Sequence, residues 1–197
     1  MGTTTDKRRF GGIERVYGPT AAQAFTRLHV TIVGMGGVGS WAVESLARAG
    51  VGKLTLVDGD VSEESNTNRQ CHAIQGNYGR WKAELMGERV KLINPDCEVN
   101  VITEVLEPDT MDAQLGTSDA LIDAIDTLKA KAALIAWGHK NGIFTLTSGG
   151  GAGRCDPGKI HVADIAAVKA DPLIGALRRE LQGSPKGKSQ RFNIPAV

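Results

Sequence analysis

The chain has 197 residues, with 23 Lys or Arg against 22 Asp or Glu, so its formal net charge is +1. This length and a hydrophobic content of 41% indicate a globular protein of one domain, with or without a short appendage. The near-neutral charge excludes a histone-like polycationic binder. The three cysteines form no CxxC pair, which argues against a zinc site and against a secreted disulfide framework. No apolar run is long enough to cross a membrane and the N-terminus has no signal-peptide pattern, so we expect a cytoplasmic protein without membrane association.

Strands and helices alternate along most of the sequence. A short β-branched segment at 28–33 predicts a buried strand, and apolar residues at helical spacing over 38–49 predict the helix that follows it. Further strands are predicted at 53–57, 98–102, 119–124 and 143–147, and further helices at 83–93 and 128–140. This alternation predicts an α/β fold, namely a Rossmann-like, doubly wound and mainly parallel sheet with helices on both faces.

The pattern changes beyond Gly153. We predict a short strand at 159–162, a helix at 172–181, a flexible basic linker at 183–188 and the beginning of a strand at 192–197. The expected organisation is an ATP-binding domain over 1–165, followed by a C-terminal part over 166–197 that is cut short.

The clearest motif is a glycine-rich turn between the first predicted strand and helix. Gly34, Gly36 and Gly39 form the pattern GxGxxG, with a further glycine at Gly37, and Asp58 follows about 20 residues later. Glycines allow a phosphate to approach the backbone at a helix N-terminus, and the acid can bind ribose hydroxyls. The pattern predicts a nucleotide site without separating NAD from ATP, and close helix–strand packing alone could also account for the glycines.

A run of polar residues after the second strand favours ATP. Asp60 is followed by Asn66, Asn68 and Arg69, and Lys82 begins the next predicted helix. Amide, guanidinium and ammonium groups can donate to the oxygens of a triphosphate, which a nicotinamide dehydrogenase would not require here. The alternative is a loop of solvated polar side chains.

Two carboxylates follow the strand predicted at 119–124. Asp123 and Asp126 lie at its carboxyl end, where open α/β sheets bind ligands. Asp126 is a candidate Mg²⁺ ligand, and it could also cap the helix that follows.

These strings together resemble one enzyme family. GMGGVGS at 34–40, DGD at 58–60, NTNRQ at 66–70, the G-x-x-K of 79–82 and DAID at 123–126 are similar to the ThiF/MoeB/HesA family of ubiquitin-activating-enzyme-like adenylyltransferases. The resemblance covers about residues 8–165. Within the family, the segments at 9–12, 17–18, 148–153, 156–157 and 171–173 resemble the branch that dehydrates threonylcarbamoyladenosine in tRNA.

The resemblance implies an enzyme that uses ATP and Mg²⁺ to adenylate a carboxylate. It implies that Gly34, Gly36, Gly37 and Gly39 line the phosphates and that Asp58, with Asp60 beside it, binds the ribose. It also implies that Asn66, Asn68, Arg69 and Lys82 contact the triphosphate and that Asp126 holds the metal, with Arg69, Lys82 and Asp126 as the catalytic set. A monovalent cation is a further possible cofactor. The sequence departs from the family at Cys71, which we interpret as a packed small residue, and by ending at Val197.

The partners implied are tRNA carrying threonylcarbamoyladenosine, a second copy of the chain in a homodimer across which Arg69 can act, and proteins of a cysteine-desulfurase system. Candidate RNA contacts are Lys7, Arg8, Arg9, Arg178, Arg179, Lys186, Lys188 and Arg191, which could equally be ordinary solvated charges. Three other functions stay open: adenylation of the C-terminal carboxylate of a ubiquitin-like sulfur carrier, an NAD-dependent oxidoreductase, and a scaffold without turnover. The four histidines, His29, His72, His139 and His161, are interpreted as structural or surface residues.

Overall fold

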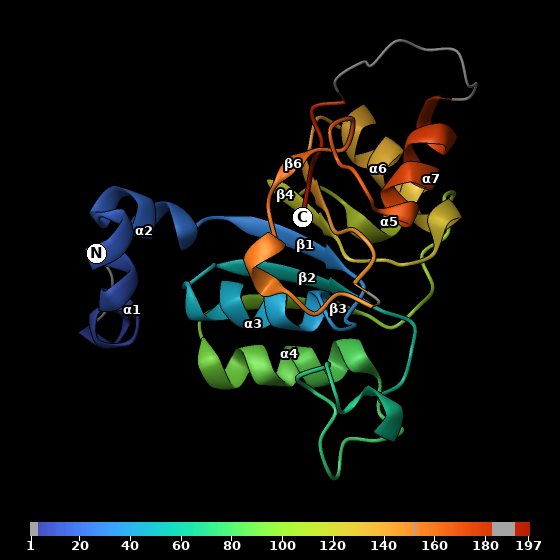
Figure 1. The fold of residues 1–197 in the computed structure, drawn as a ribbon. Coiled ribbons are helices and arrows are strands. Elements are labelled where there is room, and N and C mark those ends of the chain that lie inside the picture. Colours follow the sequence, from blue (N-terminus) through green and yellow to red (C-terminus); the bar gives the residue numbers. More distant parts are fainter. Residues whose placement is uncertain (1–3, 152, 183–191) are drawn as a thin grey trace. The chain divides into compact units, whose positions relative to one another are not determined.

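The computed structural model of the chain describes residues 4–151, 153–182 and 192–197 (Figure 1). It divides into two compact units, Met1–Val105 and Leu106–Val197, which are described separately below. The division does not coincide with the boundary expected at residue 165, because residues 165–182 and 192–196 contribute to the hydrophobic core of the second unit.

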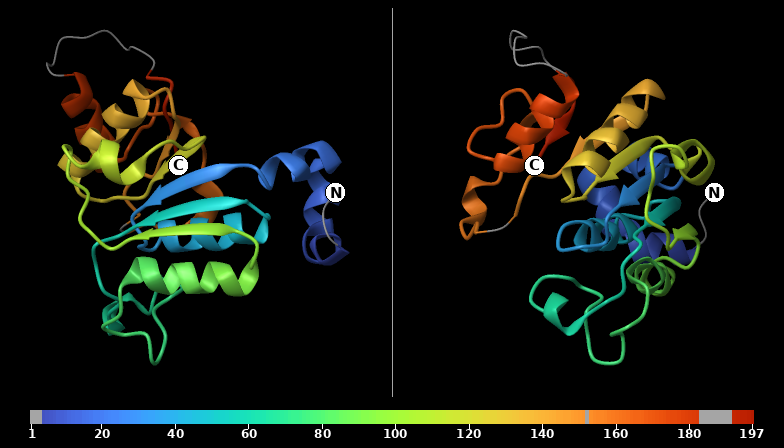
Figure 2. Two further views of the ribbon diagram at one scale, coloured as in Figure 1. Left: turned by 180° about the vertical axis from the view of Figure 1, so that it is seen from behind. Right: turned by 90° about the vertical axis from the view of Figure 1, so that its right-hand side faces the viewer.

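Three parallel strands form the sheet of the first unit. β1 (His29–Val33) and β3 (Glu98–Ile102) pair on either side of β2 (Lys53–Val57), as the view from behind shows (Figure 2, left). Val33, Val57 and Ile102 are in register, so the three carboxyl ends lie at one edge. β1 and β2 are almost wholly buried, as the continuous apolar runs predicted.

Two helices pack on this sheet. α3 (Gly39–Arg48) and α4 (Lys82–Ile93) lie side by side (Figure 1). Glu44 on α3 is buried and accepts hydrogen bonds from Arg48 and from Arg89 on α4, and the Arg89 bond lowers the pKa of the Glu44 carboxyl despite its burial. Gly87 permits the close approach of α4 to β3, because a Cβ there would lie 2.9 Å from Cγ2 of Val101.

The first unit begins with two helices that apolar periodicity did not predict. α1 (Thr4–Tyr17) is largely polar, and α2 (Pro19–Phe25) buries none of its residues. α1 is held by tertiary contacts: the Phe10 ring lies against Gly50, and the Arg9 guanidinium donates to the carbonyl oxygen of Ile93 at 2.5 Å. Such a helix gives a weak sequence signal because contacts at single residues, and not an apolar face, hold it.

The strands of the second unit follow the order β4-β5-β7-β6. β4 (Ala120–Asp123) is parallel to β5 (Phe144–Thr147), and β5 is parallel to β7 (Pro195–Ala196). β6 (Ala163–Asp164) pairs antiparallel with β7. The helices are α5 (Met111–Leu115), α6 (Leu128–Lys140) and α7 (Pro172–Gln182), with α7 packed on α6.

The strand predicted at 159–162 is wrong. A 3₁₀ turn, η2 (Pro157–Lys159), stands there, because Asp156 accepts the N–H of Gly158 and closes the turn. Ile160 and Val162 are 68% and 64% exposed and belong to no strand. The other predicted strands and helices are confirmed to within a few residues, and so is the mainly parallel α/β architecture. Within the described ranges, no helix has the length and apolar character needed to cross a bilayer.

Candidate active site

The glycine-rich turn connects β1 to α3 at the carboxyl edge of the first sheet. Gly34 has φ = 93° and donates its N–H to the carbonyl oxygen of Val57 at 2.8 Å. A side chain at Gly36 would meet nothing within 4 Å, so the space above this residue is open. The first N–H groups of α3 follow at Gly39, and a helix N-terminus attracts anions. The turn therefore offers backbone donors and room for a phosphate.

Arg69 lies against this turn in the same chain. A Cβ at Gly37 would come within 3.2 Å of Cγ of Arg69, so the glycine allows the arginine stem to pack there. Nη1 of Arg69 donates to Oδ1 of Asn68 at 2.9 Å and to the carbonyl oxygen of Ser65 at 3.3 Å. Trp41 of α3 donates its indole N–H to the Arg69 carbonyl oxygen at 2.9 Å. Arg69 and Asn68 are exposed, and five guanidinium N–H donors suit a phosphate.

Asn66 is built into the segment that carries Asn68 and Arg69. It ends the 3₁₀ turn η1 (Glu64–Asn66), and its Oδ1 accepts the N–H of Glu63 at 3.2 Å. Its carbonyl oxygen accepts the N–H groups of Arg69 and Gln70. Asn66 is 7% exposed, so the structure gives it a role in shaping the loop.

Asp58, Asp60 and Lys82 form a connected group after β2. The two carboxylate oxygens of Asp58 accept the N–H of Met35 at 2.5 Å and the N–H of Asp60 at 2.8 Å. Burial raises the pKa of the Asp58 carboxyl, while these two bonds and Lys82 act to lower it. Lys82 begins α4, and its Nζ lies 2.8 Å from Oδ2 of Asp60. The Lys82 side chain is only 9% exposed, whereas that of Asp60 is 73% exposed.

Asp126 lies in the second unit, in the segment between β4 and α6. It is exposed, and the residue that caps α6 is Thr127, which makes no side-chain capping bond. The Thr127 hydroxyl donates to Oδ1 of Asp126 at 3.5 Å. Asp126 is therefore not needed to cap α6, which leaves its carboxylate available to a ligand.

Asp123, at the end of β4, is engaged inside the second unit. Its carboxylate accepts from Nζ of Lys131 at 2.7 Å, from the Thr147 hydroxyl at 2.6 Å and from the N–H of Ile125 at 3.1 Å. Both members of the Asp123–Lys131 ion pair are fully buried, and burial raises the pKa of Asp123 against the opposing effect of Lys131. The pair ties β4, α6 and β5 together beside the segment that holds Asp126.

No site role was predicted for Asp171, which organises the glycine-rich segment after β5. Its Oδ2 accepts from the N–H of Gly150 at 3.0 Å and from Arg154 at 2.9 Å, and its Oδ1 accepts the N–H of Ile174 in α7. A Cβ at Gly149 would lie 2.5 Å from Oδ2 of Asp171. An acid before Pro172 is a helix-start signal, but its partners about 20 residues upstream leave no local signal.

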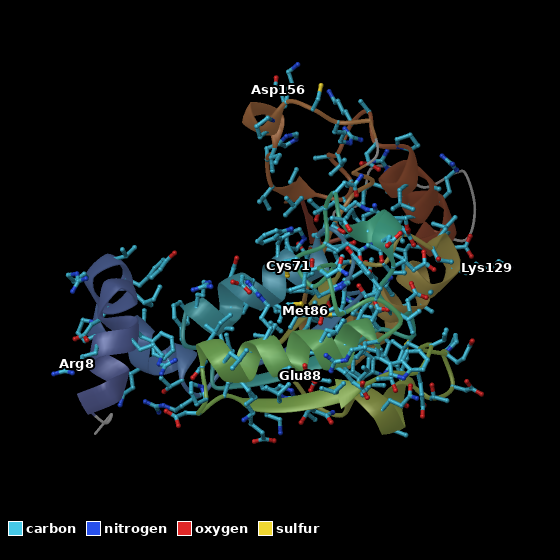
Figure 3. All side chains as sticks on the ribbon, turned by 90° about the horizontal axis from the view of Figure 1, so that it is seen from below. Arg8, Cys71, Met86, Glu88, Lys129 and Asp156 are labelled. Carbon is cyan, nitrogen blue, oxygen red and sulfur yellow. The ribbon has the colours of Figure 1, made fainter. Side chains whose placement is uncertain are left out.

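Cys71 behaves as a packed residue. It is half-buried, and its Sγ lies 3.5 Å from the carbonyl oxygen of Ser40 and 3.5 Å from Sδ of Met86 (Figure 3). Burial raises the pKa of the Cys71 thiol, which disfavours the reactive thiolate. Cys71, Cys97 and Cys155 are all free thiols.

In the part of the chain that the structure describes, no three His, Cys, Asp or Glu side chains are grouped so that they could hold a metal. Mg²⁺ commonly takes one or two protein carboxylates and completes its shell with phosphate oxygens and water. A single carboxylate such as that of Asp126 fits this mode of binding.

Comparison with known proteins shows the family to which the chain belongs. The family model described as the ThiF family matches residues 11–186. The chain belongs to the ThiF family. Among its ThiF-family relatives is the tRNA threonylcarbamoyladenosine dehydratase of Escherichia coli (strain K12), 46% identical over 195 residues, which are 97% of this chain and 73% of the relative. A crystal structure of the E. coli tRNA N6-threonylcarbamoyladenosine dehydratase in complex with ATP matches with a TM-score of 0.94 and 42% identity over 98% of this chain and 82% of that one.

A relative with another activity matches less of the chain. The molybdopterin-synthase adenylyltransferase of Salmonella typhimurium (strain LT2) is 32% identical over 109 residues, which cover 55% of this chain and 44% of that relative. The similarity to this ThiF-family member is thus confined to about half of the chain, whereas the similarity to the dehydratase runs along almost all of it.

Proposed function

We propose that this ThiF-family chain is an ATP-dependent tRNA threonylcarbamoyladenosine dehydratase. The observation that carries the proposal is the 46% identity to the E. coli dehydratase over 97% of the chain. This similarity covers almost the whole chain, whereas the molybdopterin-synthase adenylyltransferase matches 55% of it.

The residues of the first unit fit ATP. Gly34, Gly36, Gly37 and Gly39 would receive the phosphates on the turn and at the N-terminus of α3. Asp58, with Asp60 beside it, would bind the ribose, although both Asp58 oxygens already hold backbone N–H groups. Each carboxylate oxygen has a second lone pair, so a ribose hydroxyl can still donate to it. The open space at Gly36 supports this assignment.

Charge neutralisation would come from Arg69, Lys82 and a metal ion. Asn66 and Asn68 would assist, Asn68 by a direct contact and Asn66 by holding the loop. Asp126 would hold Mg²⁺, and the ion would supply positive charge against that of the phosphates. A monovalent cation is a further proposed cofactor, for which no residue is assigned.

The reaction would proceed in two steps. The carboxylate of the threonylcarbamoyl group attacks the α-phosphorus of ATP, the bond to the β-phosphate oxygen breaks, and pyrophosphate leaves. A nitrogen or oxygen of the same modification, losing its proton, then attacks the acyl carbon, and AMP departs as the ring closes. The substrate loses the elements of water, and ATP becomes AMP and pyrophosphate. No protein nucleophile is required, so the rate enhancement would come from positioning of the substrates and electrostatic stabilisation of the transition state.

The partners proposed are tRNA, a second copy of the chain and proteins of a cysteine-desulfurase system, in the cytoplasm. Among the candidate RNA contacts, Arg8 and Arg179 are exposed. Arg178 instead donates to the carbonyl oxygens of Ile165 and Val168, so its charge serves the second unit. Lys186, Lys188, Arg191 and the Lys7 side chain lie outside the described residues. The Arg69 stem packs on the glycine turn of its own chain, which supports its acting within one chain.

Pyrophosphate release tests the proposal. The purified chain is incubated with ATP, Mg²⁺ and tRNA that carries or lacks the threonylcarbamoyl group, and the digested nucleosides are then weighed by mass spectrometry. Release only with the modified tRNA, with loss of one water from the nucleoside, is the expected result. A covalent AMP adduct on an added ubiquitin-like carrier would instead support carrier activation. Bound ATP with no release would support a scaffold, and NAD bound more tightly than ATP would support an oxidoreductase.

A further inference from the structure

His72 is buried beneath the glycine-rich turn, although the proposed chemistry makes no use of it. It is 2% exposed, its Nε2 lies 3.0 Å from the carbonyl oxygen of Met35, and its Nδ1 lies 3.2 Å from Oγ of Ser62. A carbonyl oxygen only accepts, so Nε2 must carry the proton. Nδ1 of the neutral ring then accepts from the Ser62 hydroxyl. The two partners thus fix both the tautomer and the orientation of the ring.

The Met35 contact restrains the turn between two of its glycines. The Met35 peptide groups are held on both sides, since the N–H donates to Asp58 and the carbonyl oxygen accepts from His72. Met35 itself is fully buried, and Gly36 follows it with open space above its Cα. The ring therefore supports, from below, the backbone that would face the phosphates.

The Ser62 contact extends the support to Lys82. Ser62 is 1% exposed, donates its N–H to the carbonyl oxygen of Arg80 at 2.8 Å, and accepts the N–H of Gly79 at 2.7 Å. These bonds join the segment after β2 to the turn that precedes α4. Lys82 lies two residues after Arg80, and its N–H donates to the carbonyl oxygen of Asp60 at 3.0 Å. His72 is therefore one link between the glycine turn and the segment that presents Asp60 and Lys82, and the Asp58 carboxylate is another.

We propose that His72 is a positioning residue for the nucleotide, which sets the glycine turn and Lys82 at the spacing that a bound triphosphate requires. It acts through the Met35 carbonyl and the Ser62 hydroxyl without touching the nucleotide. The inference rests on the proposed function only in taking ATP as the ligand. Small displacements of positioning groups can cost up to about 100-fold in rate.

Three variants separate the two contacts. His72→Leu removes both, His72→Gln keeps an amide N–H where Nε2 donates to Met35, and His72→Asn keeps a polar atom only near Ser62. ATP affinity is measured by titration calorimetry without tRNA, followed by KM for ATP, KM for tRNA and kcat. We expect His72→Leu to weaken ATP binding and raise the KM for ATP by about 10-fold or more while the KM for tRNA is unchanged. We expect His72→Gln to restore most of the affinity and His72→Asn to restore little.

The outcomes distinguish positioning from a merely structural role. If His72→Leu is folded at the assay temperature and binds ATP as the wild type does, the proposal is overturned. If His72→Leu does not fold, the ATP affinities of His72→Gln and His72→Asn are compared. Equal affinities in these two variants overturn the proposal. A wild-type chain that binds ATP but releases no pyrophosphate with modified tRNA contradicts the proposed function alone. A wild-type chain that binds no ATP overturns both.

Discussion

At the scale of single residues, the arginine proposed to contact phosphate and the acid proposed to hold the metal are exposed. Arg69 packs its stem on Gly37 and leaves its guanidinium exposed, and Asp126 is exposed without capping α6. Neither residue fills a core position, so each can be changed without creating a cavity.

We predict that Arg69→Ala and Asp126→Ala each reduce the rate of pyrophosphate release by about 100-fold or more. Arg69 would itself oppose the negative charge of the leaving phosphates, and Asp126 would hold the Mg²⁺ that does so. Thermal unfolding of both variants should stay close to that of the wild type. Arg27→Ala, at another exposed arginine, is the control and should retain full activity. Near-wild-type turnover in either variant would remove that residue from the site.

A second residue-scale prediction concerns pH. Burial lowers the pKa of His72, with the Lys82 charge acting in the same direction and the Met35 carbonyl and Asp58 against it. The folded chain thus holds His72 neutral where the unfolded chain, with a pKa of about 6.5, takes up a proton. The free energy of unfolding should fall as pH drops below about 6.5. Between pH 8 and pH 5.5, the free energy of unfolding measured with urea should fall more for the wild type than for His72→Gln. Equal decreases would contradict the prediction that the folded chain holds His72 neutral.

At the scale of elements, close approaches of helices to strands determine which glycines can be replaced. A Cβ at Gly138 of α6 would lie 2.5 Å from the Thr145 hydroxyl and 3.0 Å from Cδ2 of Leu121. At Gly175 of α7, the nearest atoms are the far ends of two arginine side chains at 3.9 Å. We predict that Gly138→Ala destabilises the chain by about 1–3 kcal/mol. Gly175→Ala should stabilise it by about 0.5–1 kcal/mol. Urea unfolding measures whether the free energy of unfolding of each variant is lower or higher than that of the wild type.

The buried ion pair that joins β4 to α6 gives another element-scale prediction. Lys131→Met leaves the Asp123 carboxylate buried without its counter-ion and should destabilise the chain by about 3–5 kcal/mol. The double variant Asp123→Asn with Lys131→Met removes both charges and keeps an acceptor for Thr147, so it should recover a large part of this loss. Thermal unfolding measures both, and an equal loss in the single and double variants would show that the charge is not responsible.

At the scale of the whole molecule, a chain of net charge +1 must attract tRNA through local clusters of charge. Arg8 is exposed on α1, and we predict that Arg8→Ala weakens tRNA binding without changing ATP affinity. If Arg8 contacts one phosphate, the slope of log affinity against log salt concentration should become shallower by about 0.7–0.9. Lys140→Ala, at an exposed lysine at the end of α6, is the control. An unchanged slope would exclude Arg8 from the RNA surface.

The sequence by itself determined the features that depend on neighbouring residues. The apolar runs of β1 and β2 are local features of the sequence, so these two strands were predicted correctly. The strand predicted at 159–162 failed because β-branched residues there are exposed after the turn that Asp156 closes. Propensity reports only what a segment can form, and burial decides whether it does.

Only the tertiary structure decided the roles that depend on distant partners. His72 became a link between two loops because Met35, 37 positions away in sequence, presents its carbonyl to the ring. Asp171 accepts the N–H of Gly150, 21 positions away in sequence, through a hydrogen bond that no local spacing encodes. The sequence does not distinguish a polar side chain that is hydrogen-bonded to water from one that is hydrogen-bonded to protein. Its role follows from burial, because a buried donor or acceptor must find its partner within the fold.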